Sequence, residues 1–143
     1  MTPAQRQVVF INAAHSFTHY CLLILATAVL AMVQQEPAIF GTEFGPVLTL
    51  GTAMFVTYGL GALPMGWLAA RFGRRAMMGG FFLGTGLFMA AAGLMTSPLG
   101  VGIALGMMGA FAAVYHPIGT AMLVEAAGDR VGRAMGINGV FGN

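Results

Sequence analysis

The sequence predicts an all-α membrane protein with four complete transmembrane helices and the start of a fifth. Of its 143 residues, 58% are hydrophobic and only 7% are charged, whereas a soluble domain usually carries about 25% charged residues to face water. The few charges are also clustered, which leaves apolar stretches longer than the about 20 residues that a membrane helix needs. This composition excludes an ordinary soluble enzyme.

Three intervals without charge contain the expected spans, namely 7–35, 44–70 and 76–124. The first two intervals hold one span each, and the third holds two, because Thr96-Ser97-Pro98 divides it. The expected spans are residues 8–33, 46–70, 76–95 and 99–124. In the second span, Gly59, Gly61 and Pro64 predict a bend, because proline removes a helical hydrogen bond.

A fifth apolar segment begins near Ala134 and reaches Asn143 after about ten residues, too few to cross a bilayer. We therefore expect residues 1–143 to be the N-terminal part of a longer membrane domain.

The arginines predict the orientation of the chain. With the N-terminus inside, all six arginines lie in inner segments, and the outer connections hold only Glu36 and Glu43. Cytoplasmic loops carry an excess of Lys and Arg, so we expect a multi-pass protein of the cell (inner) membrane with a cytoplasmic N-terminus. The net charge of +2 is explained by this asymmetry, and nucleic acid is not an expected partner.

The most specific motif is the arginine-rich loop that follows the second span, with the sequence Gly-Trp-Leu-Ala-Ala-Arg-Phe-Gly-Arg-Arg over residues 66–75. It resembles the signature loop of the major facilitator superfamily, G-x-L-x-D-R-x-G-R-R. Ala70 departs from it, standing where the family has Asp, and this puts the usual latch contact of the loop in doubt. The matching residues are Gly66, Leu68, Arg71, Gly73, Arg74 and Arg75.

This resemblance implies a helical bundle of the facilitator type, in which about twelve spans form two halves that rock around a central site. It implies that Gly66, Arg71, Gly73, Arg74 and Arg75 form a conformational-switch loop. It also implies that the present chain covers about the first third of such a transporter.

A stretch in the fourth span, Tyr-His-Pro-Ile-Gly over residues 115–119, resembles the facilitator subgroup that includes fosmidomycin-resistance-type exporters. The segments 15–19 and 136–139 are also similar to that subgroup. An arginine that proton-coupled exporters commonly carry in this span is absent, because Leu105 stands at its place.

Polar residues within the spans mark a candidate pathway, because a polar group in hydrocarbon is costly unless it faces protein or water. Asn12, Ser16 and His19 fall on one stripe of the first span, with His15 beside it. At about 1.5 Å per residue, His15, His19 and His116 lie about 10, 17 and 12 Å from the inner ends of their spans. The expected pathway residues are Asn12, His15, His19, Tyr115 and His116.

The resemblance implies that the first and fourth helices line a common cavity, so the three imidazoles could face one water-filled space. Three interpretations of the histidines remain open at this point. They could only pack helices, they could bind an anionic substrate or relay protons since imidazole titrates near neutral pH, or they could bind a metal. No carboxylate or cysteine is placed to complete a metal set, so no metal site is expected. His15, nearest the inner end, is expected to matter less than the other two, and Tyr58 and Tyr115 could donate hydrogen bonds to a substrate.

The sequence thus predicts transport of a small solute by alternating access, by efflux or by ion coupling, with protons and the lipid bilayer as further partners. No enzymatic activity and no cofactor are expected, since no nucleotide-binding Gly-Lys-Ser/Thr loop is present. One alternative is a dimeric four-span exporter of the small multidrug resistance kind, but its first span would carry an embedded Glu. The other is a membrane scaffold subunit that transports nothing, which would need no polar stripe.

Overall fold

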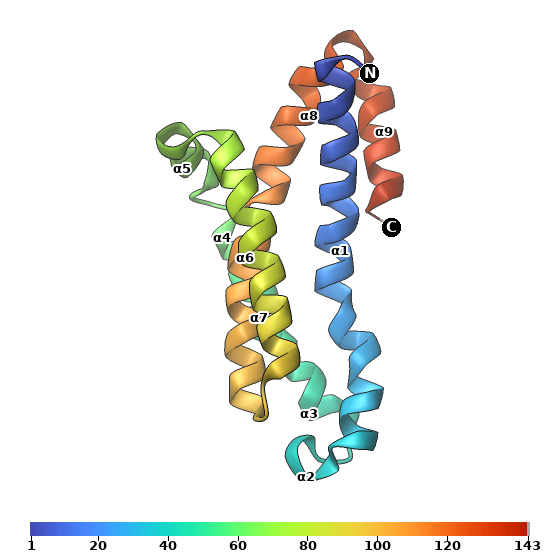
Figure 1. Cartoon of the computed structure of the whole chain (residues 1–143), viewed down its shortest axis with the longest axis vertical. Helices are drawn as coiled ribbons and strands as arrows, with labels where there is room; N and C mark the ends of the chain where they lie inside the picture. Colours follow the sequence, from blue (N-terminus) through green and yellow to red (C-terminus); the bar gives the residue numbers. More distant parts are fainter. Residues whose placement is uncertain (143) are drawn as a thin grey trace.

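The helices of this computed structural model account for most of residues 1–142, which are the residues that the structure describes (Figure 1). Two short segments are not α-helical: η1 is a π-helix and η2 is a 3₁₀ turn. The described elements are α1 (Pro3–Gln35), α2 (Pro37–Phe40), α3 (Phe44–Thr49), α4 (Gly51–Gly61), α5 (Met65–Phe72), α6 (Arg74–Leu94), α7 (Pro98–Ala112), η1 (Tyr115–Gly119), α8 (Thr120–Ala127), η2 (Gly128–Arg130) and α9 (Val131–Phe141).

The all-α fold class is confirmed: residues 1–142 contain no strand, and four helical stretches are long and apolar enough to cross a membrane. These stretches are Pro3–Gln35, Phe44–Gly61, Arg74–Leu94 and Pro98–Phe141. The last stretch includes both the expected fourth span and the fifth apolar segment, and the chain reverses within it at Gly128, whose φ is +53°.

Local sequence explains where the long helices begin and end. Thr2 and Gln5 form a reciprocal capping box at the start of α1, and the Ser97 side chain accepts a hydrogen bond from the Gly100 amide at the start of α7. Such caps satisfy amides that have no partner inside the helix. Gly73 (φ +80°) separates α5 from α6, because glycine adopts this backbone conformation without a Cβ penalty.

The second expected span is broken as its glycines and proline predict. α4 ends at Gly61, three residues form a turn, and α5 begins at Met65 directly after Pro64. The fourth expected span is not one continuous α-helix. Its residues Tyr115–Gly119, which include Pro117, form the π-helical segment η1. A π-helical turn is wider than an α-helical turn, and such turns are frequent at functional sites.

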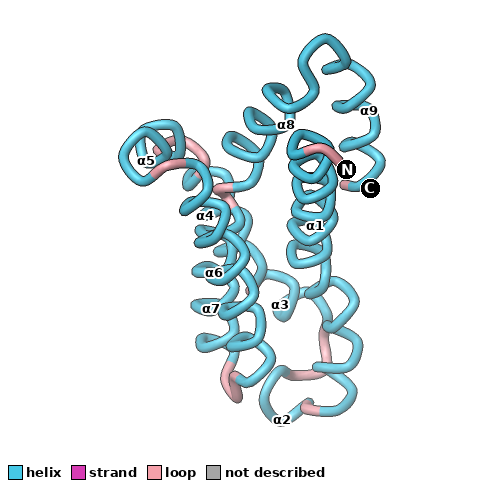
Figure 2. The backbone as a smooth tube through the Cα atoms, turned by 45° about the horizontal axis from the view of Figure 1, so that its top comes forward, coloured by secondary structure: helices cyan, strands magenta, loops and turns pink. Residues whose placement is uncertain are grey.

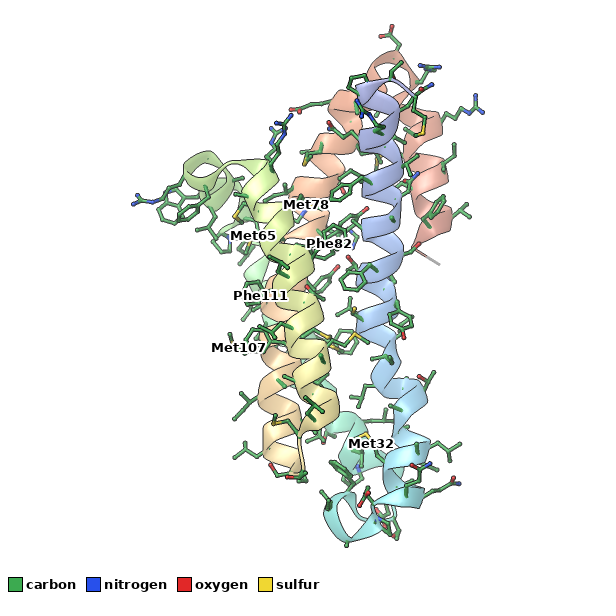
Figure 3. All side chains as sticks on the ribbon, viewed as in Figure 1. Met32, Met65, Met78, Phe82, Met107 and Phe111 are labelled. Carbon is green, nitrogen blue, oxygen red and sulfur yellow. The ribbon has the colours of Figure 1, made fainter. Side chains whose placement is uncertain are left out.

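The helices form two groups that lie side by side (Figures 1 and 2). α7 packs along α4 and α6, while α8 and α9 pack against α1. In Figure 3, Phe82 of α6 lies between the two groups, and its ring centroid is 5.1 Å from that of Phe10 and 5.5 Å from that of Phe17, both on α1. Aromatic packing therefore joins the groups along the N-terminal half of α1.

Close approach of α4 and α7 depends on small residues of α7. The Thr57 hydroxyl donates to the carbonyl oxygen of Gly106 at 2.7 Å. A Cβ added at Gly109 would collide with the backbone of Met54 and with the side chain of Thr57. Small residues at helix interfaces are typical of membrane bundles, where backbones pack directly against each other.

Candidate functional site: a histidine cluster between α1 and η1

Two of the three histidines pair along one face of α1. His15 and His19 are four residues apart, a spacing that places both side chains on the same side of a helix. Their Nε2 atoms lie 3.1 Å apart, and their ring centroids are 4.8 Å apart with the planes nearly perpendicular. The polar stripe expected on this helix therefore contains a direct contact between two imidazoles.

A backbone carbonyl fixes the orientation of His15. Its Nδ1 atom lies 2.7 Å from the carbonyl oxygen of Asn138 in α9. Because a carbonyl oxygen can only accept, Nδ1 of His15 carries the proton, and in the neutral ring Nε2 then has the free lone pair. The His15 ring is also stacked on Tyr115, with centroids 5.0 Å apart, and is 8% exposed. The lone pair of Nε2 is therefore held toward His19.

The third histidine comes from the π-helical segment. The ring centroid of His116 lies 5.4 Å from that of His15 and 6.0 Å from that of His19. Each of the three rings offers one nitrogen within 4.8 Å of the other two. His15 is buried, His19 is half-buried and His116 is exposed, so the cluster is closed at His15 and open at His116.

The buried side chains of Asn138 and Tyr115 form a hydrogen-bond network beside the cluster. The Asn138 side-chain amide donates to Asn12 Oδ1 at 2.9 Å and to the Tyr115 hydroxyl at 3.1 Å, and the Tyr115 hydroxyl donates to the carbonyl oxygen of Ile11 at 3.2 Å. These bonds connect α1, η1 and α9. Asn138 was not among the expected pathway residues, although its polar side chain in an apolar segment was a usable signal.

The structure brings the five expected pathway residues, Asn12, His15, His19, Tyr115 and His116, into one region. From its depth, nearest the inner end of its span, His15 was expected to matter less for transport than the other two histidines, and its contacts favour the opposite expectation. Its ring contacts those of both other histidines. Depth along a helix does not report which neighbouring rings a side chain meets, and here His15 is the centre of the cluster.

Tyr58 lies beside this region. Its ring centroid is 6.0 Å from that of His116, and its buried hydroxyl has no hydrogen-bond partner within the described residues. A phenol hydroxyl in a buried setting usually finds a partner. Tyr58 therefore has an unpartnered hydroxyl donor on a ring that neighbours His116, and its contact with a substrate stays a prediction.

The arginine-rich loop is separate from the cluster, at the junction of α5 and α6. Arg74 forms an ion pair with Glu125 of α8, and the Arg71 guanidinium lies 5.9 Å from the ring centroid of Phe72. Gly73 provides the turn, while no atom of the described chain lies within 4 Å of a Cβ added at Gly66. The loop is thus joined to α8 by one exposed ion pair, between the start of α6 and the C-terminal half of α8.

The charge of the cluster comes from imidazole alone. All four acidic residues of the chain (Glu36, Glu43, Glu125 and Asp129) lie outside the expected spans. Neutral imidazoles can exchange a proton, donate or accept a hydrogen bond, or ligate a cation, whereas a protonated imidazole attracts an anion. The cluster therefore offers imidazole groups for hydrogen bonding, proton exchange and the binding of a charged ligand.

Comparison with known families identifies the chain. A family model described as the Major Facilitator Superfamily matches residues 9–143. The chain belongs to the major facilitator superfamily. No curated protein and no solved structure matches it. Facilitators are membrane transporters rather than enzymes, so this chain belongs to a transporter family, and the expected family, fold class and multi-pass membrane character are confirmed.

Proposed function

We propose that this facilitator carries a small solute across the cell (inner) membrane by alternating access, with the histidine cluster in its transport pathway. The observation that carries the proposal is the convergence of His15, His19 and His116 from two separate elements, α1 and η1. Ionisable groups within membrane segments are costly to place and commonly belong to substrate or ion pathways. Helix packing alone does not require three imidazoles in mutual contact.

The polar neighbours of the cluster support a binding role. The exposed His116 ring and the ring of Tyr58 are neighbours, and the buried Tyr58 hydroxyl has no hydrogen-bond partner within the described residues, so a movement that uncovers this hydroxyl would offer a solute a hydrogen-bond donor close to an imidazole. We propose that the transport is efflux or is coupled to an ion, with protons exchanged at the imidazoles. The likeness of residues 115–119 to fosmidomycin-resistance-type exporters agrees with efflux and remains a prediction.

The arrangement of the termini and turns supports a cytoplasmic N-terminus. The N-terminus and the turn between α8 and α9 lie at the upper end of the molecule in Figure 1, and α5 lies in the upper half, whereas α2 lies at the lower end. The arginines belong to the upper segments, and Glu36 and Glu43 flank α2. We propose that the upper end faces the cytoplasm, and that the loop residues Gly66, Arg71, Gly73, Arg74 and Arg75 act in the conformational switch there.

The proposal is tested by solute uptake into proteoliposomes, with a panel of radiolabelled small organic anions and cations to find a transported probe. His19→Ala and His116→Ala should each lower uptake per inserted molecule at least tenfold, or flatten its pH dependence. The measurement runs from about pH 5.5 to about pH 8, which brackets the ordinary imidazole pKa of about 6.5. His15→Ala should have an equal or larger effect because of its central place.

Tyr20→Ala is the matched control, because Tyr20 is next to His19 in sequence but is 61% exposed. It should transport as the unmodified chain does. If all three histidine variants match the unmodified chain at every pH, the histidines only pack helices and the proposed pathway is wrong.

A further inference from the structure

The spacing of the His15 and His19 nitrogens is close to that of two ligands around one metal ion, and the His116 nitrogen lies nearby. Zinc–imidazole bonds of about 2.0–2.1 Å in a tetrahedral site place neighbouring ligand nitrogens about 3.3 Å apart. The Nε2 atoms of His15 and His19 lie 3.1 Å apart, and the nitrogen of His116 lies within 4.8 Å of both. Binding one ion therefore requires the His116 nitrogen to approach the other two, and the exposed side of its ring leaves room for this movement.

The hydrogen bond from His15 to Asn138 is a second and independent observation. Metal-ligating histidines commonly donate their other ring N–H to a carbonyl or carboxylate, which fixes the tautomer and aims the free nitrogen at the metal. Nδ1 of His15 makes this bond, at 2.7 Å from the Asn138 carbonyl oxygen. Its Nε2 lone pair therefore points into the cluster, where in the free site it accepts the one proton that it shares with His19.

The ligand set also defines the kind of ion. Imidazole suits borderline ions such as Zn²⁺, Co²⁺, Ni²⁺ and Cu²⁺, whereas Ca²⁺ and Mg²⁺ require oxygen ligands. No carboxylate belongs to the cluster, and three protein ligands leave the fourth position of a tetrahedral ion open. That position would face the side on which His116 is exposed.

We propose that His15, His19 and His116 together bind one divalent first-row transition-metal ion, with a fourth coordination position open to water or to a group on the transported solute. The inference deepens the proposed function, because an ion bound in the transport pathway belongs to what the transporter carries or uses. The binding itself does not depend on transport and can be measured alone.

The test is a titration of the full chain in detergent with Zn²⁺ and with Co²⁺, whose visible absorption reports tetrahedral coordination. The chain contains only these three histidines, so a purification tag without histidine is used. A Cys21→Ala background removes the one thiol. We expect one ion per chain, and at least a tenfold loss of affinity in each of His15→Ala, His19→Ala and His116→Ala. Tyr20→Ala should bind as the background does.

Mg²⁺ and Ca²⁺ at the same concentrations should not compete with Zn²⁺. Circular dichroism and the thermal midpoint of each variant show whether it is folded. A folded triple-alanine variant that keeps the affinity for Zn²⁺ would overturn the proposal, and so would a background chain that binds less than one ion.

The two proposals fail separately. Absent metal binding together with histidine-dependent solute uptake overturns the metal site and leaves the transport pathway standing. Histidine-dependent metal binding together with unaffected uptake supports the metal site and removes the histidines from the transport pathway.

Discussion

The side-chain amide of Asn138 donates a hydrogen bond to Oδ1 of Asn12, 126 residues away in the chain, at 2.9 Å. Both side chains are nearly inaccessible, with exposures of 4% and 5%. This bond fastens α9 to α1 at the level of the histidine cluster. It thereby holds the Asn138 carbonyl oxygen against His15, so the stability of the bundle and the geometry of the site depend on the same contact.

Asn138→Leu should lower the free energy of unfolding by about 1 kcal/mol, because it leaves the Asn12 amide and the Tyr115 hydroxyl short of a partner. The measurement is thermal unfolding followed by the reaction of a fluorogenic maleimide with Cys21, which is fully buried and is the only cysteine. The exposed Thr27→Ala variant is the control. The double variant Asn12→Leu/Asn138→Leu should recover part of the lost free energy of unfolding. An unchanged thermal midpoint for Asn138→Leu would contradict a structural role for this bond.

Gly109→Ala should destabilise the bundle by about 1–3 kcal/mol, the usual cost of inserting a methyl group into a packed interface. The added Cβ would meet the Met54 carbonyl and the Thr57 hydroxyl, and α4 and α7 would have to separate. Gly79→Ala is the matched control, because no atom of the described chain lies within 4 Å of its added Cβ. The same Cys21 assay applies. Equal midpoints for the two alanine variants would show that the close approach of α4 and α7 is not required.

The ion pair between Arg74 and Glu125 should contribute about 0–1 kcal/mol, since both side chains are substantially exposed, at 42% and 61%. A double-mutant cycle with Arg74→Gln and Glu125→Gln measures the coupling. It should decrease further in about 1 M salt, where the Debye length is only about 3 Å. A coupling free energy well above this range that does not decrease in salt would contradict the exposed setting of the pair and would mean that another group buries it.

Single cysteines in a Cys21→Ala background test the proposed orientation. Thr42→Cys, beside α2, should react with a membrane-impermeant maleimide added outside the cell, whereas Asp129→Cys, in η2, should react only after the cells are opened. The reason is the arginine asymmetry between the two ends. The opposite labelling order would place the N-terminus outside.

The helical fold could be predicted because its causes are local. Long apolar intervals, the divider Thr96-Ser97-Pro98 and the expected bend at Pro64 act on the residues around them, and each has its counterpart in the structure. The polar stripe of α1 was likewise visible, because side chains four residues apart share a helix face.

The features of the site that the sequence did not predict depend on contacts between segments that are distant in the chain. The position of His116 follows from a π-helical segment, and proline alone predicts a bend but not a widened turn. The role of Asn138 follows from the packing of α9 on α1, and the central position of His15 follows from both. Hydrophobic periodicity describes which face of a helix is polar, but it does not define which other helix meets that face.

The π-helical segment η1 is also the joint at which the chain passes from one helical group to the other. α7, before it, packs with α4 and α6, while α8, after it, packs with α1 and α9. His116 lies in this connecting segment, whereas His15 and His19 lie on the long helix α1. Any bending there changes the distance from the His116 nitrogen to those of His15 and His19, so relative motion of the two groups would assemble or open the cluster, and whatever the cluster holds would in turn bias that motion.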